Sequence, residues 1–386
     1  MKAGWQYKTL NHIAENLDGK RVPITKNVRS SGAYPYYGAS GIVDFVGDYI
    51  FDGDLLLVSE DGANLLARTY PIAFSISGKA WVNNHAHVLR FKENVTQKLV
   101  EYYLNSIPLN DYVSGMAQPK LNQKMLNTIP VPFPPLSEQQ RIVTILDEAF
   151  EGIATATANA KKNLANAREL FESYLQSVFT SKGEGWLTKN LSEVCLIKPP
   201  KSEAKINLDM SDLVSFIPME SLGISQKYFD ASRVRTLKEV AGSYTYFANG
   251  DVLLAKITPC FENGKLGIAR NLKNGVGFGS SEYIVFRTLP ALHNEYLYYF
   301  LFRKSFIEEG SARMTGAVGH KRVAKEFIEN TLIILPPFAK QEAIVTKLDE
   351  LSAEIKGLEA IYQQKLTALD ELKKSILNQA FSGQLN

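Results

Sequence analysis

The chain contains few of the residues from which metal centres and disulfide frameworks are built. Its 386 residues include only two cysteines, Cys195 and Cys260, and five histidines. The cysteines lack the short spacing of a metal or redox motif, which favours buried thiols in a reducing cytoplasm. No run of 18 apolar residues is present, and residues 1–5 have no apolar stretch behind their lysine. We therefore expect neither a membrane span nor a secretory signal.

Motifs of catalysis are missing as well. The chain has no Gly-x-x-x-x-Gly-Lys-Ser/Thr phosphate loop and no His-Glu-x-x-His, and residues 198–201 lack the asparagine and aromatic residue of an Asn-Pro-Pro-Tyr methylation element. The glycine-rich stretch 275–279 is more typical of a turn, or of backbone close to DNA, than of a cofactor loop. His85 and His87 alternate like two metal ligands, but no third ligand is nearby, so polar strand-end side chains are the simpler interpretation. The sequence predicts no catalytic residue, no metal site and no bound cofactor.

A long internal repeat is the most informative feature that is present. The fifteen residues 134–148 return 202 positions later at 336–350, and nine of the fifteen are identical. The same offset relates several downstream pairs, among them Leu164 and Leu366. A repeat of this length indicates two copies of one structural unit and hence an approximate internal two-fold symmetry.

Each copy predicts a long helix that begins after a Pro-Pro pair and ends near a glycine, Gly183 or Gly383. Apolar residues recur at steps of three and four, the spacing of a coiled-coil stripe. A helix of about 44 residues would be roughly 65 Å long, so we expect the two stripes to bury each other in an antiparallel pair. Two helices lying separately on two globular domains are the alternative. The predicted spacer contacts are Ile142, Leu146, Ile153, Leu164, Phe171, Tyr174, Ile344, Leu348, Leu351, Ile355, Leu358, Tyr362 and Leu366.

The segments between the helices form the other half of the duplication. Gly53–Leu57 matches Gly250–Leu254 as a turn that leads into a buried strand. A second matched strand is predicted at 87–91 and 283–287, and a short helix at 99–104 and 296–301. The loops between these elements differ, as expected for two domains with one framework and different targets. The predicted organisation is a domain at 1–133, a helix region at 134–182, a second domain at 183–335 and a second helix region at 336–386.

These residues resemble the specificity subunits of type I restriction–modification enzymes over the whole chain. The resemblance rests on Pro-Pro-Leu-Ser-Glu-Gln-Gln-Arg-Ile at 134–142, the helix 160–179, Gly-Glu-Gly-Trp at 183–186, and the second Pro-Pro helix. Residues 115–122, Gly-Met-Ala-Gln-Pro-Lys-Leu-Asn, also resemble a family motif, whereas the second copy at 316–323 lacks the glutamine.

The resemblance implies an α+β fold. Two similar α/β target-recognition domains would be separated by a long antiparallel two-helix coiled coil with internal pseudo-two-fold symmetry. Each domain would read half of a split site in double-stranded DNA, and the helices would set the gap. The chain would be non-catalytic. Two methyltransferase subunits using S-adenosylmethionine and two restriction–translocase subunits using ATP and magnesium would dock on it.

Side chains for reading DNA should be hydrogen-bonding residues on loops that can enter the major groove, with lysine and arginine available for phosphates. The first domain offers Ser59, Asn64, Arg68, Lys79, Asn83, Asn84, His85, Gln118, Lys120, Asn122 and Lys124. The second offers Lys256, Thr258, Asn263, Lys265, Ser280, Ser281, Arg313, Thr315, His320, Lys321 and Arg322.

Two other functions are weighed against this interpretation of the sequence. The net charge of +3 is only mildly basic and is weak support for a nucleic-acid partner. A structural coiled-coil adaptor whose globular ends bind proteins is the alternative, and salt-dependent binding of one duplex sequence would separate the two. A self-sufficient methyltransferase or nuclease conflicts with the missing motifs.

Overall fold

A computed structural model describes residues 4–115, 117–317 and 319–385. Met116 and Val318, from the two glycine-led motifs, lie outside the described residues, as do residues 1–3 and 386. The chain divides into two compact units. Unit 1 comprises residues 1–161 and 363–386, and unit 2 comprises residues 162–362. Each unit holds one globular part together with part of the two long helices, α5 (Leu136–Thr180) and α11 (Phe338–Ser382).

The globular part of unit 1 is built around a four-stranded antiparallel sheet. Its order is β2 (Ala14–Asn16), β8 (Ala86–Phe91), β5 (Leu55–Ser59) and β6 (Ala73–Ile76). A three-stranded sheet has the order β4 (Gly41–Val46), β3 (Ser31–Gly38) and β7 (Trp81–Val82). The first and last strands, β1 (Gln6–Thr9) and β9 (Pro130–Phe133), form an antiparallel pair of their own. The helices are α1 (Leu10–Ile13), α2 (Asn64–Ala67), α3 (Asn94–Ser106) and α4 (Gln123–Thr128).

Unit 2 repeats this plan. Its central sheet has the order β11 (Cys195–Ile197), β18 (Tyr283–Thr288), β15 (Val252–Ala255) and β16 (Leu266–Ile268). The second sheet has the order β13 (Val234–Thr236), β12 (Leu213–Ile217), β17 (Val276–Gly279) and β14 (Thr245–Ala248). The strands β10 (Leu187–Asn190) and β19 (Leu332–Leu335) correspond to β1 and β9. The helices are α6 (Leu191–Val194), α7 (Leu237–Val240), α8 (Asn294–Phe302), α9 (Lys304–Ala312) and α10 (Lys325–Asn330).

The matched strands and helices lie where the sequence predicts them. All five residues of β5 and all four of β15 are buried, as expected for continuous apolar runs in the middle of a sheet. Each strand is preceded by a glycine with a left-handed backbone, Gly53 at φ +123° and Gly250 at φ +89°. Side chains other than glycine rarely adopt this conformation, which explains why glycine occupies both turns. The glycine-rich stretch at 275–279 belongs largely to β17, where a Cβ on Gly277 would lie 2.2 Å from the Phe247 ring.

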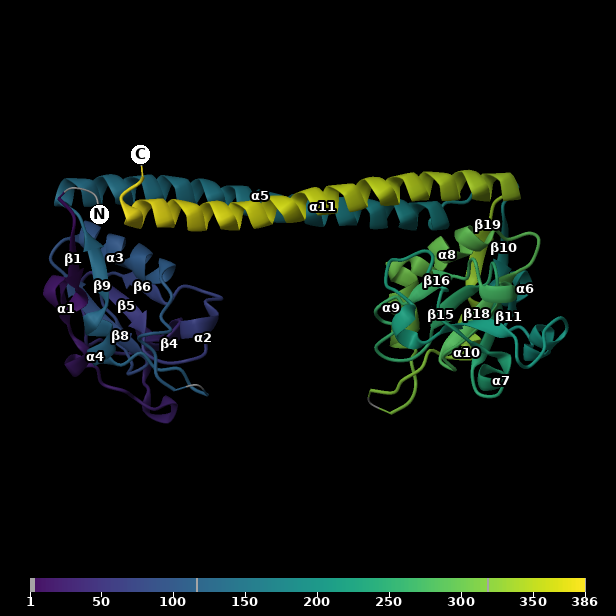
Figure 1. Cartoon of the computed structure of the whole chain (residues 1–386), viewed down its shortest axis with the longest axis horizontal. Helices are drawn as coiled ribbons and strands as arrows, with labels where there is room; N and C mark the ends of the chain where they lie inside the picture. The colour runs from purple at the N-terminus through teal and green to yellow at the C-terminus, as the bar shows by residue number, and fades with distance from the viewer. Residues whose placement is uncertain (1–3, 116, 318, 386) are drawn as a thin grey trace. The chain divides into compact units, whose positions relative to one another are not determined.

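In each unit the two long helices run antiparallel to one another (Figure 1). In unit 1 the start of α5 meets the end of α11, and Arg141 Nη2 donates to the Leu385 carbonyl at 2.8 Å. In unit 2 the later part of α5 meets the earlier part of α11, and Arg168 Nε lies 2.6 Å from Glu359 Oε1. The helices also pack on the globular parts, because Leu99 of α3 shares a buried cluster with Ile142 and Leu146. The observed packing therefore combines the two arrangements considered from the sequence.

The predicted stripe is only partly buried. Ile142, Leu146, Phe171, Leu348 and Ile355 are buried. Ile153, Leu164, Ile344, Leu351, Tyr362 and Leu366 are half-buried. Tyr174 and Leu358, by contrast, are exposed at 37% and 40%, so the prediction that they form the buried stripe is wrong. Next to Tyr174, α5 buries Leu175 and Phe179 instead, because this part of the helix packs on the globular part of unit 2 as well as on α11.

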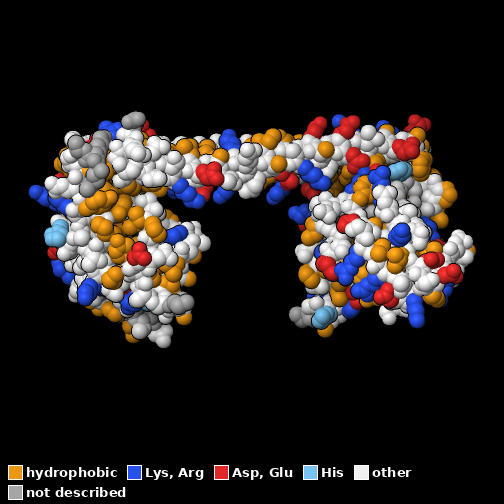
Figure 2. All heavy atoms as spheres, in the orientation of Figure 1, with side chains coloured by type: hydrophobic (Ala, Val, Ile, Leu, Met, Phe, Trp, Pro, Cys, Tyr) orange, Lys and Arg blue, Asp and Glu red, His pale blue; other side chains and the backbone are white. Residues whose placement is uncertain are grey.

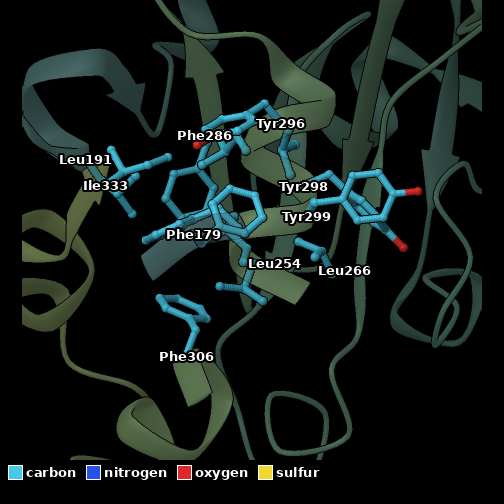
Figure 3. Close-up of a cluster of buried hydrophobic side chains, with 14 of the residues drawn as sticks. Phe179, Leu191, Leu254, Leu266, Phe286, Tyr296, Tyr298, Tyr299, Phe306 and Ile333 are labelled. Atoms are coloured by element: carbon cyan, nitrogen blue, oxygen red, sulfur yellow. The ribbon is translucent and has the colours of Figure 1, made fainter. Parts of the chain in front are cut away.

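The largest core of unit 2 joins α5 to α8 (Figure 3). The ring centroid of Phe179 lies 4.7 Å from that of Tyr296 and 5.6 Å from that of Phe300. Phe286 of β18 and Phe306 of α9 belong to the same cluster. The end of α5 is thus part of the core of the globular domain, which fixes the domain on this helix within the unit.

Candidate DNA interface

Three loop segments meet at one end of the central sheet in unit 1. In the loop after β5, the Glu60 carbonyl accepts a hydrogen bond from Leu121 N at 2.8 Å. Gly62 N, in the same loop, donates to the Pro119 carbonyl at 3.0 Å. Glu60 N in turn donates to the carbonyl of His85, just before β8, at 2.9 Å. Ser114 and Lys120 exchange two backbone hydrogen bonds of 2.9 and 2.8 Å, which close a hairpin between these two residues.

The same hydrogen bonds recur in unit 2. Val323 N donates to the Lys256 carbonyl at 3.0 Å, Thr258 N to the Lys321 carbonyl at 2.9 Å, and Lys256 N to the Glu282 carbonyl at 2.9 Å. Thr315 and Arg322 close the matching hairpin with bonds of 3.0 and 2.8 Å. We call these clusters the loop ends, defined by residues 60–62, 83–85, 114–115 and 117–120 in unit 1 and by 256–258, 280–282, 315–317 and 319–322 in unit 2. Each hairpin projects from the side of its globular part that lies away from the long helices (Figure 1).

Both hairpins depend on a glycine at the same place. Gly115 has φ +83° and Gly316 has φ +128°. A Cβ on Gly115 would lie 2.7 Å from the Gln118 carbonyl oxygen, and one on Gly316 would lie 2.9 Å from the His320 carbonyl oxygen. The backbone turn is therefore common to both units, although the second copy lacks the glutamine of the family motif.

At each loop end an acidic residue holds a basic one. Lys120 Nζ lies 3.1 Å from Glu60 Oε1, and Arg322 donates two hydrogen bonds of 2.9 and 2.7 Å to Glu282. The hydrogen bond from Arg322 lowers the pKa of Glu282, so this carboxylate stays charged. The side chains of Lys120 and Arg322 are 52% and 46% exposed, which leaves both cations open to a phosphate or to a base edge.

The central residues of the two loop ends differ in charge. By matched hydrogen bonds, Glu60 corresponds to Lys256 and His85 corresponds to Glu282. Lys256 Nζ donates to the Ser281 carbonyl at 3.0 Å, and burial lowers the pKa of its ammonium group. In Figure 2 lysine and arginine side chains are interspersed with acidic ones over the globular part of unit 2. One backbone arrangement thus presents two different patterns of donors and acceptors.

Several predicted DNA-contacting residues are exposed at or close to the loop ends. In unit 1 these are Asn84, His85, Gln118 and Lys120. In unit 2 they are Asn263, Ser281, Arg313, Thr315, His320, Lys321 and Arg322. Two further exposed residues lie on other segments, Lys79 with its Nζ 4.5 Å from the centre of the Tyr49 ring, and Lys124 on α4. The fold therefore brings eleven of these thirteen exposed residues to or close to the loop ends.

Other predicted residues have their side chains bound within the protein. Asn64 is buried, and its Oδ1 accepts hydrogen bonds from Thr69 N and Tyr70 N. Arg68 donates to the carbonyls of Leu104 at 3.2 Å and Ile107 at 2.5 Å, where α3 ends, and burial lowers its pKa. The remaining members of this group are Ser59, Asn83, Asn122, Thr258, Lys265 and Ser280, each hydrogen-bonded to the backbone. These eight side chains stabilise the loops in this structure.

The sequence missed a buried ionic cluster beside the loop end of unit 1. Asp18, Glu60 and His87 bring ligand-type atoms within 4.8 Å of one another. Arg21 already pairs with Glu60 at 2.7 Å, and both ring nitrogens of His87 are hydrogen-bonded, so these residues do not suit a metal ion. His85 lies outside the cluster and is exposed, with Nδ1 2.8 Å from Asp61. The alternation of His85 and His87 in the sequence indicates this region, but no sequence pattern points to the acidic residues Asp18 and Glu60.

Residues 2–166 and 183–367 match the family model of the type I restriction modification DNA specificity domain. Because the match covers more than half of the chain, the chain belongs to this family. Among the described residues, none of the helices combines the length and apolar character that a bilayer crossing requires.

Individual relatives agree. A Haemophilus influenzae protein named as a type I restriction enzyme specificity subunit is 27% identical over 385 residues, covering 97% of this chain and 95% of that protein. The Escherichia coli EcoAI specificity subunit is 40% identical over 194 residues, which cover 48% of this chain and 31% of that protein.

Two solved structures share the fold. A chain from a structure of complex assembly and conformational transition in the type I R-M system matches with a TM-score of 0.72 and 20% identity, covering 100% of this chain and 99% of that chain. The HsdS subunit from Thermoanaerobacter tengcongensis matches with a TM-score of 0.57 and 19% identity, covering 100% and 98%. The predicted family and fold class are confirmed. The chain is a specificity subunit of a type I restriction–modification system, a DNA-recognition component and not a catalytic one.

Proposed function

We propose that each loop end reads one half of a bipartite site in double-stranded DNA. The observation that carries this proposal is the duplicated loop end, which has the same backbone hydrogen bonds but different side chains at matched positions. A shared backbone would present its side chains to DNA in the same way, and different side chains would select different base edges. Lys120 and Arg322 occupy the same place in the two hairpins and would contact phosphate or guanine.

The acid beside each cation gives the contact a second role. In the free protein Glu60 and Glu282 hold Lys120 and Arg322 in position. A DNA phosphate would replace that carboxylate as the partner of the cation, while a base other than the correct one would leave the carboxylate or the cation unpaired. Unpaired buried charges are costly, which is a physical basis for discrimination between sequences.

The long helices would act as the spacer that sets the gap between half-sites, and the domains and helices would dock the partner subunits. These partners would be two methyltransferase subunits and two restriction–translocase subunits, acting in the cytoplasm. S-adenosylmethionine, ATP and magnesium would be bound by those subunits and not by this chain.

Selection of bound duplexes from a random library, with the full chain, tests the proposal. The expected result is a split sequence of two constant blocks with a gap of fixed length, bound with an affinity that falls as salt rises because phosphate contacts release counterions. Bound sequences with a single unsplit block would contradict the two-reader model. Binding that is independent of both DNA sequence and salt would favour the alternative of a protein adaptor.

A further inference from the structure

A cavity of about 630 Å³ opens beside the loop end of unit 2, among β14, β18 and α10. This volume lies within the roughly 300–1,000 Å³ that is typical of ligand clefts. Lys256 and Ser281 belong both to its wall and to the loop end, so the cavity is continuous with the surface that we assign to DNA reading. Three more lysines line it, Lys198, Lys201 and Lys325, and we call it the lysine pocket.

The lysine pocket holds more positive than negative charge. Of the described residues that line it, only Glu329 is acidic, and its carboxylate lies 3.1 Å from the Lys325 ammonium group. Lys201 and Lys256 each donate to one backbone carbonyl, at 2.9 and 3.0 Å. Because an ammonium group has three N–H donors, both lysines keep donors for a ligand. In the part of the chain that the structure describes, the ammonium group of Lys198 has no hydrogen-bond or ion-pair partner.

Positive charges also gather around Lys256. Burial lowers the pKa of its ammonium group, and the charges of Arg322 and Lys198 lower it further. Glu282 acts in the opposite direction from 3.9 Å, but it is shared with Arg322, which donates two hydrogen bonds to it. An anion beside Lys256 and Lys198 would relieve their repulsion. Two buried tyrosine rings form part of the wall, and they would strengthen the attraction by keeping water away from the charges.

Matched backbone hydrogen bonds show which part of unit 1 corresponds to the lysine pocket. Leu17 N and Lys198 N make the same hydrogen bond of 2.8 Å to the neighbouring strand, β8 in unit 1 and β18 in unit 2. Lys198 therefore corresponds to Leu17. The next residue along the chain is Asp18 in unit 1 and Pro199 in unit 2, so these two residues also correspond.

Unit 1 supplies two acids at this place, and neither has an acidic counterpart in unit 2. Asp18 and Glu60 are both buried, and Arg21 Nη1 lies 2.7 Å from a Glu60 oxygen. In unit 2 the two positions are occupied by Pro199 and Lys256. The cation of unit 1 is therefore neutralised within the protein, whereas the lysines of unit 2 need an anion from outside.

We propose that the lysine pocket binds one phosphate group of the DNA backbone beside the second half-site. The inference rests on the proposed function, which places the second half-site at the loop end of unit 2. Lysine ammonium groups bind phosphate as compact point charges. Phosphate contacts fix the position of a protein on the duplex and carry no sequence information. The pocket thus anchors unit 2 on DNA, and unit 1 has no such anchor at the corresponding place.

Salt titration of a double variant tests the pocket. Lys198→Met with Lys201→Met removes two charges, keeps the apolar stems and leaves Lys256 of the loop end in place. Each phosphate contact contributes about 0.9 to the salt slope, so loss of one contact should weaken binding of the selected duplex roughly eightfold at 0.1 M salt relative to 1 M. The affinity ratio between the intact duplex and one with a scrambled second half-site should stay constant, because a phosphate contact does not depend on sequence.

Lys20→Met is the matched control. Lys20 follows Leu17 by three residues, as Lys201 follows Lys198, and it is exposed. Its place in unit 1 is next to the acidic residues, so its removal should leave the salt slope unchanged. An equal fall of the slope in Lys20→Met would show that only the overall charge matters, and the proposal would be wrong.

A neutral DNA backbone identifies the phosphate. Single methylphosphonates are placed in turn along both strands in and beside the second half-site. One position should weaken binding by wild-type protein about as much as the double variant does, and should cause no further loss in that variant. If every position weakens both proteins equally, no phosphate enters the pocket. Lys198→Met alone removes no hydrogen bond of the described structure and serves in the same scan if the double variant does not fold.

The remaining outcomes separate this proposal from its alternatives. A double variant that binds the duplex normally but loses affinity for inorganic phosphate, or for a methyltransferase subunit, would overturn the DNA contact in favour of a free anion or an acidic protein. A split site selected by a protein whose salt slope does not change in the variant would refute the pocket alone. Failure to select any split site would refute the proposed function.

Discussion

Arg68 and Lys120 are both predicted from the sequence as DNA contacts, but the structure gives them different roles that mutation can separate. The Arg68 guanidinium donates to two carbonyls at the end of α3 and is half-buried. Hydrogen bonds from charged groups contribute about 1.5–3 kcal/mol each when well placed. Partial exposure reduces this, so we expect Arg68→Met to lower the free energy of unfolding of unit 1 by about 2 kcal/mol. For a unit of this size such a loss corresponds to roughly 4–8 °C in Tm.

Lys120→Met should behave in the opposite way. Its ion pair with Glu60 is 52% exposed on the lysine side, and such pairs contribute at most about 1 kcal/mol. Glu60 also keeps its pair with Arg21 at 2.7 Å after the change. The melting temperature should therefore hardly move. Binding of the first half-site should weaken, and the salt slope should fall by about one if the contact is to a phosphate.

Calorimetric melting and DNA titration of the two variants, side by side, check both expectations. Methionine keeps the apolar stem of each side chain, and at Arg68 it leaves the left-handed backbone, φ +53°, equally strained in wild type and variant. An Arg68→Met protein with an unchanged melting temperature but weakened binding of the first half-site would refute the structural role assigned to Arg68. Early melting of Lys120→Met, or equal weakening of both half-sites, would refute the role assigned to Lys120.

Three further predictions follow from other parts of the molecule. A heptad inserted into both α5 and α11 should lengthen the spacer by about 10 Å, and the selected gap should grow by about three base pairs with unchanged half-sites; an unchanged gap would exclude the helices as the spacer. Leu348→Ala should lower the free energy of unfolding by about 3–5 kcal/mol because the residue is fully buried, whereas Leu358→Ala, on the same helix but 40% exposed, should change it by less than about 0.5 kcal/mol in urea titrations. Burial raises the pKa of Cys195 to about 12, so at neutral pH this thiol should resist alkylation until the protein unfolds; mass spectrometry that finds Cys195 labelled in the native protein would contradict the burial.

The sequence predicts the regular elements well because their signal is local. The spacing of Ile142, Leu146, Leu348 and Ile355 fits only a helix, and all four are buried. The stripe fails at Tyr174, however, because burial there is decided by a distant element. Phe179 packs on rings of α8, more than 100 residues further along the chain, and the helix turns Leu175 and Phe179 inward to meet them.

Side-chain direction in the loops is harder to predict for the same reason. Asn64 and Arg68 have the composition of DNA-reading residues, but their hydrogen-bond partners lie inward, at Tyr70 and at the end of α3. The acid that holds Lys120 comes from a loop 60 residues earlier, and no local pattern reveals that pairing. The correspondence between Lys120 and Arg322 could be predicted from the sequence, because the two residues are separated by the same offset as the duplicated helices.

The pairing of first and last strands has a consequence for how such a protein can change its target. In each globular part the entering and leaving strands lie side by side, β1 against β9 and β10 against β19. The polypeptide therefore enters and leaves each domain at adjacent positions, and the leaving strand ends only a few residues before the start of α5 or α11. A foreign domain with the same paired edge strands could be exchanged there without altering the path of either helix, so new DNA targets are accessible by transplanting one module at a time.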